Sequence, residues 1–385
     1  MKRGSLAPKF FLLKALHYAI TTSFSSFVLA YLKDARSLDD SRSSLLLMLY
    51  TIGAFAGQFA FGRLCDVLRT HKKAFWLSCG LIAPVAVALY TAPAYRAIAA
   101  LYMLFGFCQM PLSVVIDTWF LDSFPGDTGL YGKVLASGAC AYAVLSFSYG
   151  RLLDAVGYGI MPYCLIGLLL LAVLLSLAIP DASSAASAEK AAGKGARLIS
   201  APLALLLVAL LGTGFCGNTY SLLPVLMDHV PGGSLGLLGL AMSSSGIFQI
   251  PFMLITGKMK RVPARLRVAI AGVIYFVMVM CFAFGNSPWY LIFGAGISGA
   301  AWGILLPAYR ELVEGIAPAA VRTTAQGLAD ATYLSLGGVC ASGFVSATSG
   351  SLGLRAPLLM ISAVQAAAIA LLLLWQVRVG RRARG

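Results

Sequence analysis

The amino-acid sequence predicts an all-α membrane protein with twelve transmembrane helices in two six-helix halves. Of its 385 residues, 59% are hydrophobic and 11% are charged, whereas about a quarter of the residues in a soluble domain are charged. Apolar stretches of about 20 residues, the length that crosses the hydrocarbon of a bilayer, follow one another along almost the whole chain. A single polar stretch near the middle divides them into two groups of six.

The apolar stretches give the expected spans in order. We place them at residues 10–32, 43–63, 74–91, 95–120, 133–153, 159–179, 198–227, 235–256, 267–285, 289–313, 324–347 and 355–377. They are too long, and too uniformly apolar, for the strands of a transmembrane barrel. The first one follows Lys2, Arg3 and Lys9, and we expect an uncleaved helix there, because many spans follow it and no small-residue cleavage site is evident.

The polar stretch at residues 181–197 is rich in Ala, Ser and Lys. We expect it to be a linker between an N-terminal bundle, residues 1–180, and a C-terminal bundle, residues 198–385. Most of the 29 lysines and arginines fall in the N-terminus, the even-numbered loops and the C-terminal tail. The positive-inside rule therefore predicts that both termini lie in the cytoplasm and that the protein resides in the cell membrane. The net charge of +15 then reflects topology, and we expect no nucleic-acid partner.

The residues that build metal, redox or enzymatic sites are scattered. His17, His71 and His229 lie in three separate places, and no CxxC pair occurs. We therefore expect no metal, no cofactor, no disulfide and no catalytic cluster, and we do not expect an enzyme. The eight cysteines, mostly inside apolar runs, are Cys65, Cys79, Cys108, Cys140, Cys164, Cys216, Cys281 and Cys340.

The loop after the second span carries a glycine, an aspartate and a basic cluster. Its members are Gly62, Asp66, Arg69, Lys72 and Lys73. The glycine permits a close helix contact, the aspartate can cap or pair at a neighbouring helix end, and the basic residues hold the loop in the cytoplasm. The loop after the eighth span, residues 257–265, repeats the glycine and the basic run without the aspartate.

This loop resembles the signature of the major facilitator superfamily, in which glycine, aspartate and a basic cluster follow one another between helices 2 and 3. The span count and the linker position match the same family. The resemblance implies that two bundles rock about a central site lined by helices 1, 4, 7 and 10, and that the loop motif serves this conformational change.

Three short segments resemble one branch of this superfamily in particular. Residues 318–327, 249–253 and 131–133 are similar to the branch that holds lactose-permease-like, nucleoside and phenylpropionate proton symporters. Gln249 stands where that branch commonly has glutamate, and the sugar-binding arginine of helix 5 has no counterpart after Lys133. The fifth span lacks the proline of the drug antiporters, which favours uptake or exchange over export.

Ionisable and polar side chains inside the spans are the candidates for substrate binding or proton coupling, because a charge in hydrocarbon is costly unless it is partnered or hydrated. Lys14, His17 and Tyr18 share one face of the first span at spacings i, i+3 and i+4, and Thr21 and Ser25 continue that face. The full set is Lys14, His17, Tyr18, Asp117, Asn218, Tyr220, Gln249, Tyr309, Arg310, Glu311 and Asp330.

Each charged candidate has two interpretations. Lys14 either meets an anionic substrate group or Asp117, or extends to the cytoplasmic interface. Asp117 either accepts a proton or gates the carrier, or it is a static partner of Lys14 or Lys133. Arg310 either clamps a carboxylate or anchors its helix end, and it need not pair with Glu311, which points in another direction.

The remaining candidates are less ambiguous. Asp330 could couple protons, as Asp117 could, but we interpret it as part of a structural ion pair. Asn218 and Gln249 suit sugar, nucleoside or amide recognition, although contact between helices is their commoner role. We expect Gly299 and Gly303 to allow a close helix contact, and Pro111, Pro224, Pro251 and Pro307 to interrupt their spans.

Together these features predict a monomeric secondary transporter that moves a small organic solute across the lipid bilayer by alternating access. Proton symport is the expected mode, with facilitated uniport, exchange or drug efflux as alternatives and a non-transporting receptor as a remote one. If Lys14 and Arg310 face the cavity, the substrate carries a carboxylate. If they do not, the cavity is aromatic and neutral, and it suits an amphipathic or nucleoside-like solute.

Overall fold

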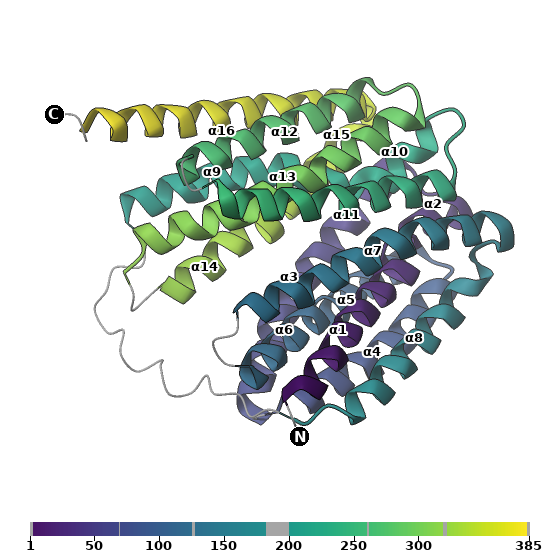
Figure 1. Cartoon of the computed structure of the whole chain (residues 1–385). Helices are drawn as coiled ribbons and strands as arrows, with labels where there is room; N and C mark the ends of the chain where they lie inside the picture. The colour runs from purple at the N-terminus through teal and green to yellow at the C-terminus, as the bar shows by residue number, and fades with distance from the viewer. Residues whose placement is uncertain are drawn as a thin grey trace. The chain divides into compact units, whose positions relative to one another are not determined.

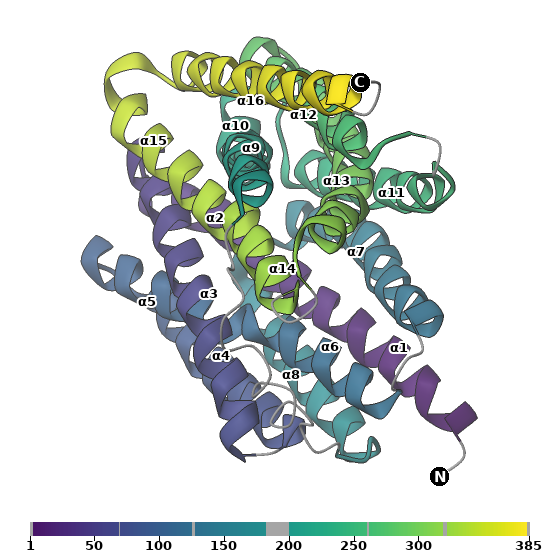
Figure 2. The same cartoon turned by 90° about the vertical axis from the view of Figure 1, so that its left-hand side faces the viewer.

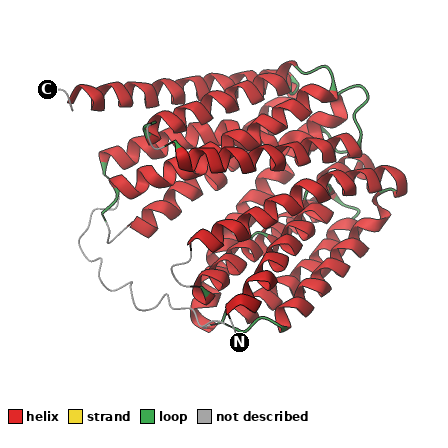
Figure 3. Ribbon diagram, viewed as in Figure 1, coloured by secondary structure: helices red, strands yellow, loops and turns green. Residues whose placement is uncertain are grey.

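The computed structural model describes residues 3–68, 70–124, 128–181, 200–259, 262–318 and 322–382. Within these ranges the chain is helical and contains no strand (Figures 1 and 3). In apolar surroundings every backbone N–H and C=O needs a partner inside the protein, and a helix supplies those partners within its own segment. The fold class predicted from the sequence is confirmed.

The elements follow the predicted spans. They are α1 (Arg3–Ile20), η1 (Thr21–Ser25), α2 (Val28–Arg36), α3 (Asp40–Leu68), α4 (His71–Thr91), α5 (Tyr95–Gln109), α6 (Pro111–Ser123), α7 (Thr128–Val156), η2 (Tyr158–Ile160), α8 (Met161–Leu177), α9 (Ala201–Gly217), η3 (Asn218–Leu222), α10 (Leu223–His229), α11 (Leu235–Lys258), α12 (Ala264–Phe284), α13 (Pro288–Ile316), α14 (Arg322–Asp330), η5 (Ala331–Leu336), α15 (Gly337–Leu352) and α16 (Arg355–Arg382).

In the described chain, eleven helical segments are long and apolar enough to cross a membrane, and they match the second to the twelfth predicted spans. The predicted first span is formed by α1, η1 and α2 in succession. The π-helical turn η1 and the turn residues Ser26 and Phe27 divide it. Lys14 and His17 also lower its apolar content. The protein is a multi-pass membrane protein.

The chain divides into two compact units. The first comprises Met1–Leu38, Leu49–Lys190 and Leu235–Ser243, and the second comprises Asp39–Met48, Ala191–Ser234 and Ser244–Gly385. The opening turns of α3 therefore group with the second unit, and those of α11 group with the first.

In the first unit, α1 packs against α6, α7 and α8, and α4 packs against α5, α6 and α8. Helices α3 and α5 approach closely at glycines. A Cβ atom added to Gly57 would lie 2.1 Å from the carbonyl oxygen of Phe107, a separation that no side chain tolerates. Gly62 on the same helix has open space around it. The close contact expected at Gly62 was therefore wrong; it lies earlier in α3, at Gly57.

In the second unit, α12 packs against α13 and α16, while α9 packs against α15, α16 and η5. Figure 2 shows α14 and α15 as successive parts of one rod joined through η5. A Cβ atom on Gly299 would lie 1.9 Å from the carbonyl oxygen of Ser245, and one on Gly303 would lie 2.6 Å from that of Gln249. The close contact predicted at these two glycines is confirmed.

The four prolines expected to interrupt spans behave in two ways. Pro111 begins α6 and Pro224 lies in the first turn of α10, so both stand at breaks, where a missing N–H costs nothing. Pro251 lies inside α11 and Pro307 lies inside α13, and both helices continue past them. The interruption expected at Pro251 and Pro307 was wrong.

Side chains from other helices hold the opening turns of α3 and α11. Asp154 of α7 accepts hydrogen bonds from the N–H groups of Leu235 and Gly236, at 3.0 and 2.8 Å, and so caps α11. At α3, the Ser41 and Ser346 hydroxyls each donate to the other residue's carbonyl oxygen. These side-chain contacts agree with the grouping of each opening turn with the unit that holds its partner.

Candidate functional site

The first unit contains a buried ion pair between the first and fourth spans. The Lys14 ammonium lies 2.6 Å from Oδ1 of Asp117 and donates to the Ser113 hydroxyl at 3.0 Å. The Lys14 side chain is 1% exposed and that of Asp117 is 22% exposed. Lys14 therefore does not extend to the interface. Of the partners considered from the sequence, Asp117 is the one it contacts.

The Tyr18 ring lies beside Lys14 of this pair, and two further rings contact it. Tyr18 lies edge-on to His17, with ring centroids 5.4 Å apart, and to Tyr142, at 6.0 Å. The Lys14 ammonium lies 5.9 Å from the centre of the Tyr18 ring, within cation–π range. His17 is buried, and its Nδ1 has no hydrogen-bond partner among the described residues. The predicted face of the first span is therefore a contiguous cluster.

A hydrogen-bonded chain extends the cluster along span 1. Tyr50 donates to Oε1 of Gln109 at 2.7 Å, Nε2 of Gln109 donates to the Thr21 hydroxyl at 2.9 Å, and that hydroxyl donates to the His17 carbonyl oxygen. Gln109 is 1% exposed. Gln109 and Tyr50 were not among the residues predicted from the sequence. An amide inside the apolar span 95–120 was the available signal.

The second unit contains another charged cluster, between the tenth and eleventh spans. The Tyr309 hydroxyl donates to Oδ1 of Asp330, and Arg310 lies 3.3 Å from Oδ2 of the same carboxylate. Gln326 donates to the Arg310 carbonyl oxygen at 2.8 Å. Asp330 thus has a phenol and a guanidinium as partners, in agreement with the ion pair expected from the sequence.

Asn218 lies where α9 ends, next to the π-helical turn η5. Its Nδ2 donates to the carbonyl oxygens of Gly214 and Tyr333, at 2.7 and 2.8 Å. Because both contacts are acceptors, they fix the orientation of the amide, and Oδ1 points elsewhere. Tyr333 also stacks on Trp302 and donates to the Tyr275 hydroxyl. A π-helical turn leaves backbone groups without helical partners and often marks a functional site.

Several predicted residues lie outside these clusters. Glu311 forms an ion pair with Arg267, which is 3% exposed, rather than with Arg310, as the divergent directions had indicated. Gln249 lies on α11 beside α13, and its side chain makes no hydrogen bond to the described residues. Tyr220 lies in η3, half-buried, two residues beyond Asn218.

The loop motif after the second span is only partly within the described residues. Arg69 and the side chain of Asp66 lie outside them. Lys72 donates to the carbonyl oxygens of Leu177 and Ile179, at 3.3 and 3.0 Å, at the C-terminal end of α8, where a cation is favourable. Lys73 has an exposed side chain. The predicted linker is described only at residue 181.

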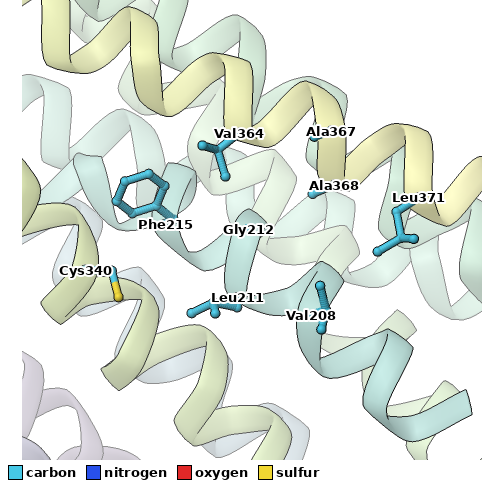
Figure 4. A pocket seen from close by; sticks show the side chains of 9 residues that line it. All are labelled: Val208, Leu211, Gly212, Phe215, Cys340, Val364, Ala367, Ala368 and Leu371. Carbon is cyan, nitrogen blue, oxygen red and sulfur yellow. The ribbon is translucent and has the colours of Figure 1, made fainter. Parts of the chain in front are cut away.

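An apolar cavity of about 530 Å³ lies in the second unit between α9, α15 and α16. Figure 4 shows Val208, Leu211 and Phe215 facing Val364 and Leu371, with Cys340 at one side. No charged residue lines it, and none of the predicted site residues does. Its lining suits hydrocarbon, so it is distinct from both polar clusters.

The described residues include side chains of the kinds that form metal sites and disulfides. No group of three or more histidine, cysteine, aspartate or glutamate side chains within it could hold a metal ion. All eight cysteines are free thiols. What the geometry offers is two polar clusters inside spanning helices, one in each unit.

The sequence matches a known protein family. The sequence model of the Major Facilitator Superfamily matches residues 10–339. The chain belongs to this superfamily. The family resemblance of the sequence is thereby confirmed over most of its length, and the members that match are transporters.

Among curated relatives of this superfamily, the maltose permease of Geobacillus stearothermophilus is 25% identical over 315 residues, which cover 80% of this chain and 78% of the permease. Two crystal structures of the nucleoside transporter NupG match with TM-scores of 0.80 and 0.78 at 15% and 16% identity, over 96% and 97% of this chain and 99% and 98% of theirs. A POT family transporter in complex with a thioalcohol-conjugated peptide has a TM-score of 0.75 at 11% identity, over 97% and 96%. These structural matches show the fold.

Proposed function

We propose that this protein is a secondary transporter that moves a small, neutral, polar organic solute across a cell membrane by proton-coupled alternating access. In this proposal residues 1–180 and 198–385 act as the two moving bundles, residues 181–197 link them, and both termini lie in the cytoplasm. The protein acts as a monomer and catalyses no chemical reaction. Membership of a transporter superfamily supports the general activity.

The observation that carries the proposal is the ion pair between Lys14 and Asp117. A lysine that is 1% exposed inside a spanning segment costs free energy, and replacing a buried ion pair by apolar side chains is often neutral or stabilising. Ionisable groups in such positions usually serve transport or coupling. Stability gives little reason to keep this pair, and its position therefore supports a role in transport.

The charge balance of the site supports a neutral solute. Lys14 is paired with Asp117, Arg310 with Asp330, and Arg267 with Glu311. Each of these three cations therefore has a carboxylate of the protein beside it, and a substrate carboxylate would compete with that partner. Hydroxyl and amide groups of a sugar or nucleoside would instead meet the Tyr18 hydroxyl without displacing an ion. Maltose and nucleosides, named for the relatives, are of this kind.

Asp117 is the proposed proton carrier. Its carboxylate is 22% exposed while its partner is buried, so water has access to the acid but hardly to the amine. Protonation of Asp117 would release Lys14, and its deprotonation would restore the pair. Asp330 accepts hydrogen bonds from both Tyr309 and Arg310, and we assign it a structural role.

The test is uptake into proteoliposomes of the purified protein, with radiolabelled uridine and radiolabelled maltose as probes. We expect saturable uptake of at least one probe, stimulated by an acidic exterior and abolished by a protonophore. Saturable uptake that does not depend on the pH gradient would contradict proton symport and indicate facilitated exchange. Absence of uptake across a panel of sugars, nucleosides and peptides would contradict the proposal.

A further inference from the structure

The Tyr18 ring and the Lys14 side chain lie against a glycine of α7. A Cβ atom added to Gly138 would lie 2.5 Å from both Cδ2 and Cε2 of Tyr18 and 3.2 Å from Cγ of Lys14. Carbon atoms in contact are normally about 3.5–4.0 Å apart. Any side chain at position 138 would therefore occupy the space that these two residues now fill.

The space beside the Cα atom of Gly138, called the recess below, is filled by the Tyr18 ring, and neighbouring side chains contact that ring on its other sides. His17 and Tyr142 contact it edge-on, and the Lys14 ammonium lies 5.9 Å from its centre. Lys14 in turn is fixed by Asp117 and Ser113. The ring therefore has little freedom to move elsewhere while the recess exists.

The Tyr18 hydroxyl is the polar group that this arrangement positions. It has no hydrogen-bond partner among the described residues, although a phenol inside a spanning segment gains from one. A neutral solute with hydroxyl or amide groups supplies such a partner. The depth of the recess then decides where that hydrogen bond forms.

We propose that Gly138 is a positioning residue that sets solute affinity by seating the Tyr18 ring, an inference that rests on the function proposed above. The bare Cα of Gly138 admits the ring. A methyl group there pushes the ring away by about 1 Å, a displacement larger than the roughly 0.5 Å within which a binding group must be held. The Lys14 stem has to shift as well.

The perturbation is separable from misfolding. The atoms that a methyl group at position 138 would meet belong to side chains, so the ring can turn away and the backbone of α7 can stay. Gly132, on the same helix, provides a matched control, because it is exposed and has nothing within 4 Å of an added Cβ atom. Alanine also gains helix propensity at both positions, so the difference between them reports the contact with Tyr18.

The experiment compares the parent with Gly138→Ala, Gly132→Ala, Tyr18→Ala and the double variant Gly138→Ala/Tyr18→Ala. Uptake of radiolabelled uridine or maltose into proteoliposomes gives KM and the maximal rate. We expect Gly138→Ala to raise KM at least about tenfold and to change the maximal rate less than about twofold, whereas Gly132→Ala stays within about twofold in both. In the Tyr18→Ala background, Gly138→Ala should have no further effect, because the ring it displaces is gone. An unchanged KM in Gly138→Ala, or an equal loss in both backgrounds, would overturn the inference.

A second measurement separates this inference from the proposed function. The midpoint of thermal unfolding in detergent requires no substrate. We expect Gly138→Ala to lower it in the parent and not in the Tyr18→Ala background. Strict additivity of the two substitutions would show that Gly138 does not seat Tyr18, whatever the protein transports. Non-additive unfolding in a protein that takes up no solute would instead contradict the transport function alone.

Discussion

The ion pair between Lys14 and Asp117 makes an asymmetric prediction about stability. Asp117→Asn leaves an ammonium that is 1% exposed with Ser113 as its remaining partner, and an uncompensated buried charge costs about 3–5 kcal/mol. Lys14→Met leaves a carboxylate that is 22% exposed and can reach water, so the loss should be clearly smaller. The double variant Lys14→Met/Asp117→Leu removes both charges and should unfold near the parent, or above it.

The assay is thermal unfolding of the purified variants in detergent, followed by intrinsic fluorescence. The control is Arg42→Met, which removes one partner of an ion pair with Asp39 whose side chains are 58% and 61% exposed; such pairs contribute about 0–1 kcal/mol. The reasoning is refuted if Asp117→Asn is no more damaging than Arg42→Met. It is equally refuted if the double variant is no more stable than Asp117→Asn.

Two further predictions concern packing. Gln365 of α16 is fully buried, and neither its amide nitrogen nor its oxygen has a partner among the described residues, so Gln365→Leu should raise the free energy of unfolding by about 1–3 kcal/mol; a lower unfolding midpoint would contradict this. On α3, Gly57→Ala should destabilise by about 1–3 kcal/mol through its contact with the Phe107 carbonyl oxygen. Gly62→Ala, with open space around it, should leave the unfolding midpoint unchanged or slightly higher, and equal losses for the two variants would contradict the packing described for α3.

The helical framework could be predicted because apolar length and charge distribution are properties of the sequence itself. Spans two to twelve correspond to helices that satisfy the length and polarity needed to cross a membrane. The first span was predicted as one helix, whereas a π-helical turn at Thr21–Ser25 divides it. The spacing of side chains in the sequence does not indicate such a turn. A π-helical turn differs from an α-helical turn in its backbone hydrogen bonds, and it requires no particular residue composition.

The same turn explains part of the site prediction. Lys14, His17 and Tyr18 precede it, and they form the contiguous cluster expected from spacings i, i+3 and i+4. Thr21 and Ser25 are the first and last residues of the π-helical turn, so they do not continue the face of Lys14, His17 and Tyr18 at regular spacing. Thr21 meets Gln109 instead, and the Ser25 hydroxyl is enclosed without a partner among the described residues.

Partners between distant spans were the part that the sequence could not specify. The spacing on one helix shows which residues share a face, but it does not show which helix that face meets. Asp117 was considered as a partner of Lys14 only because few carboxylates lie inside the spans. Tyr275 and Gly138 gave no comparable signal, since a phenol and a glycine are common in spanning helices for packing alone, and the amide of Gln109 did not indicate which helix it meets.

The central claim, that Lys14 and Asp117 couple a proton gradient to solute movement, is tested most directly by one comparison in proteoliposomes. The double variant Lys14→Met/Asp117→Leu, expected to be as stable as the parent, is assayed for accumulation driven by a pH gradient and for counterflow of the same labelled solute without a gradient. We predict that counterflow persists and that accumulation is lost. Accumulation at the parental level in the double variant would contradict the account.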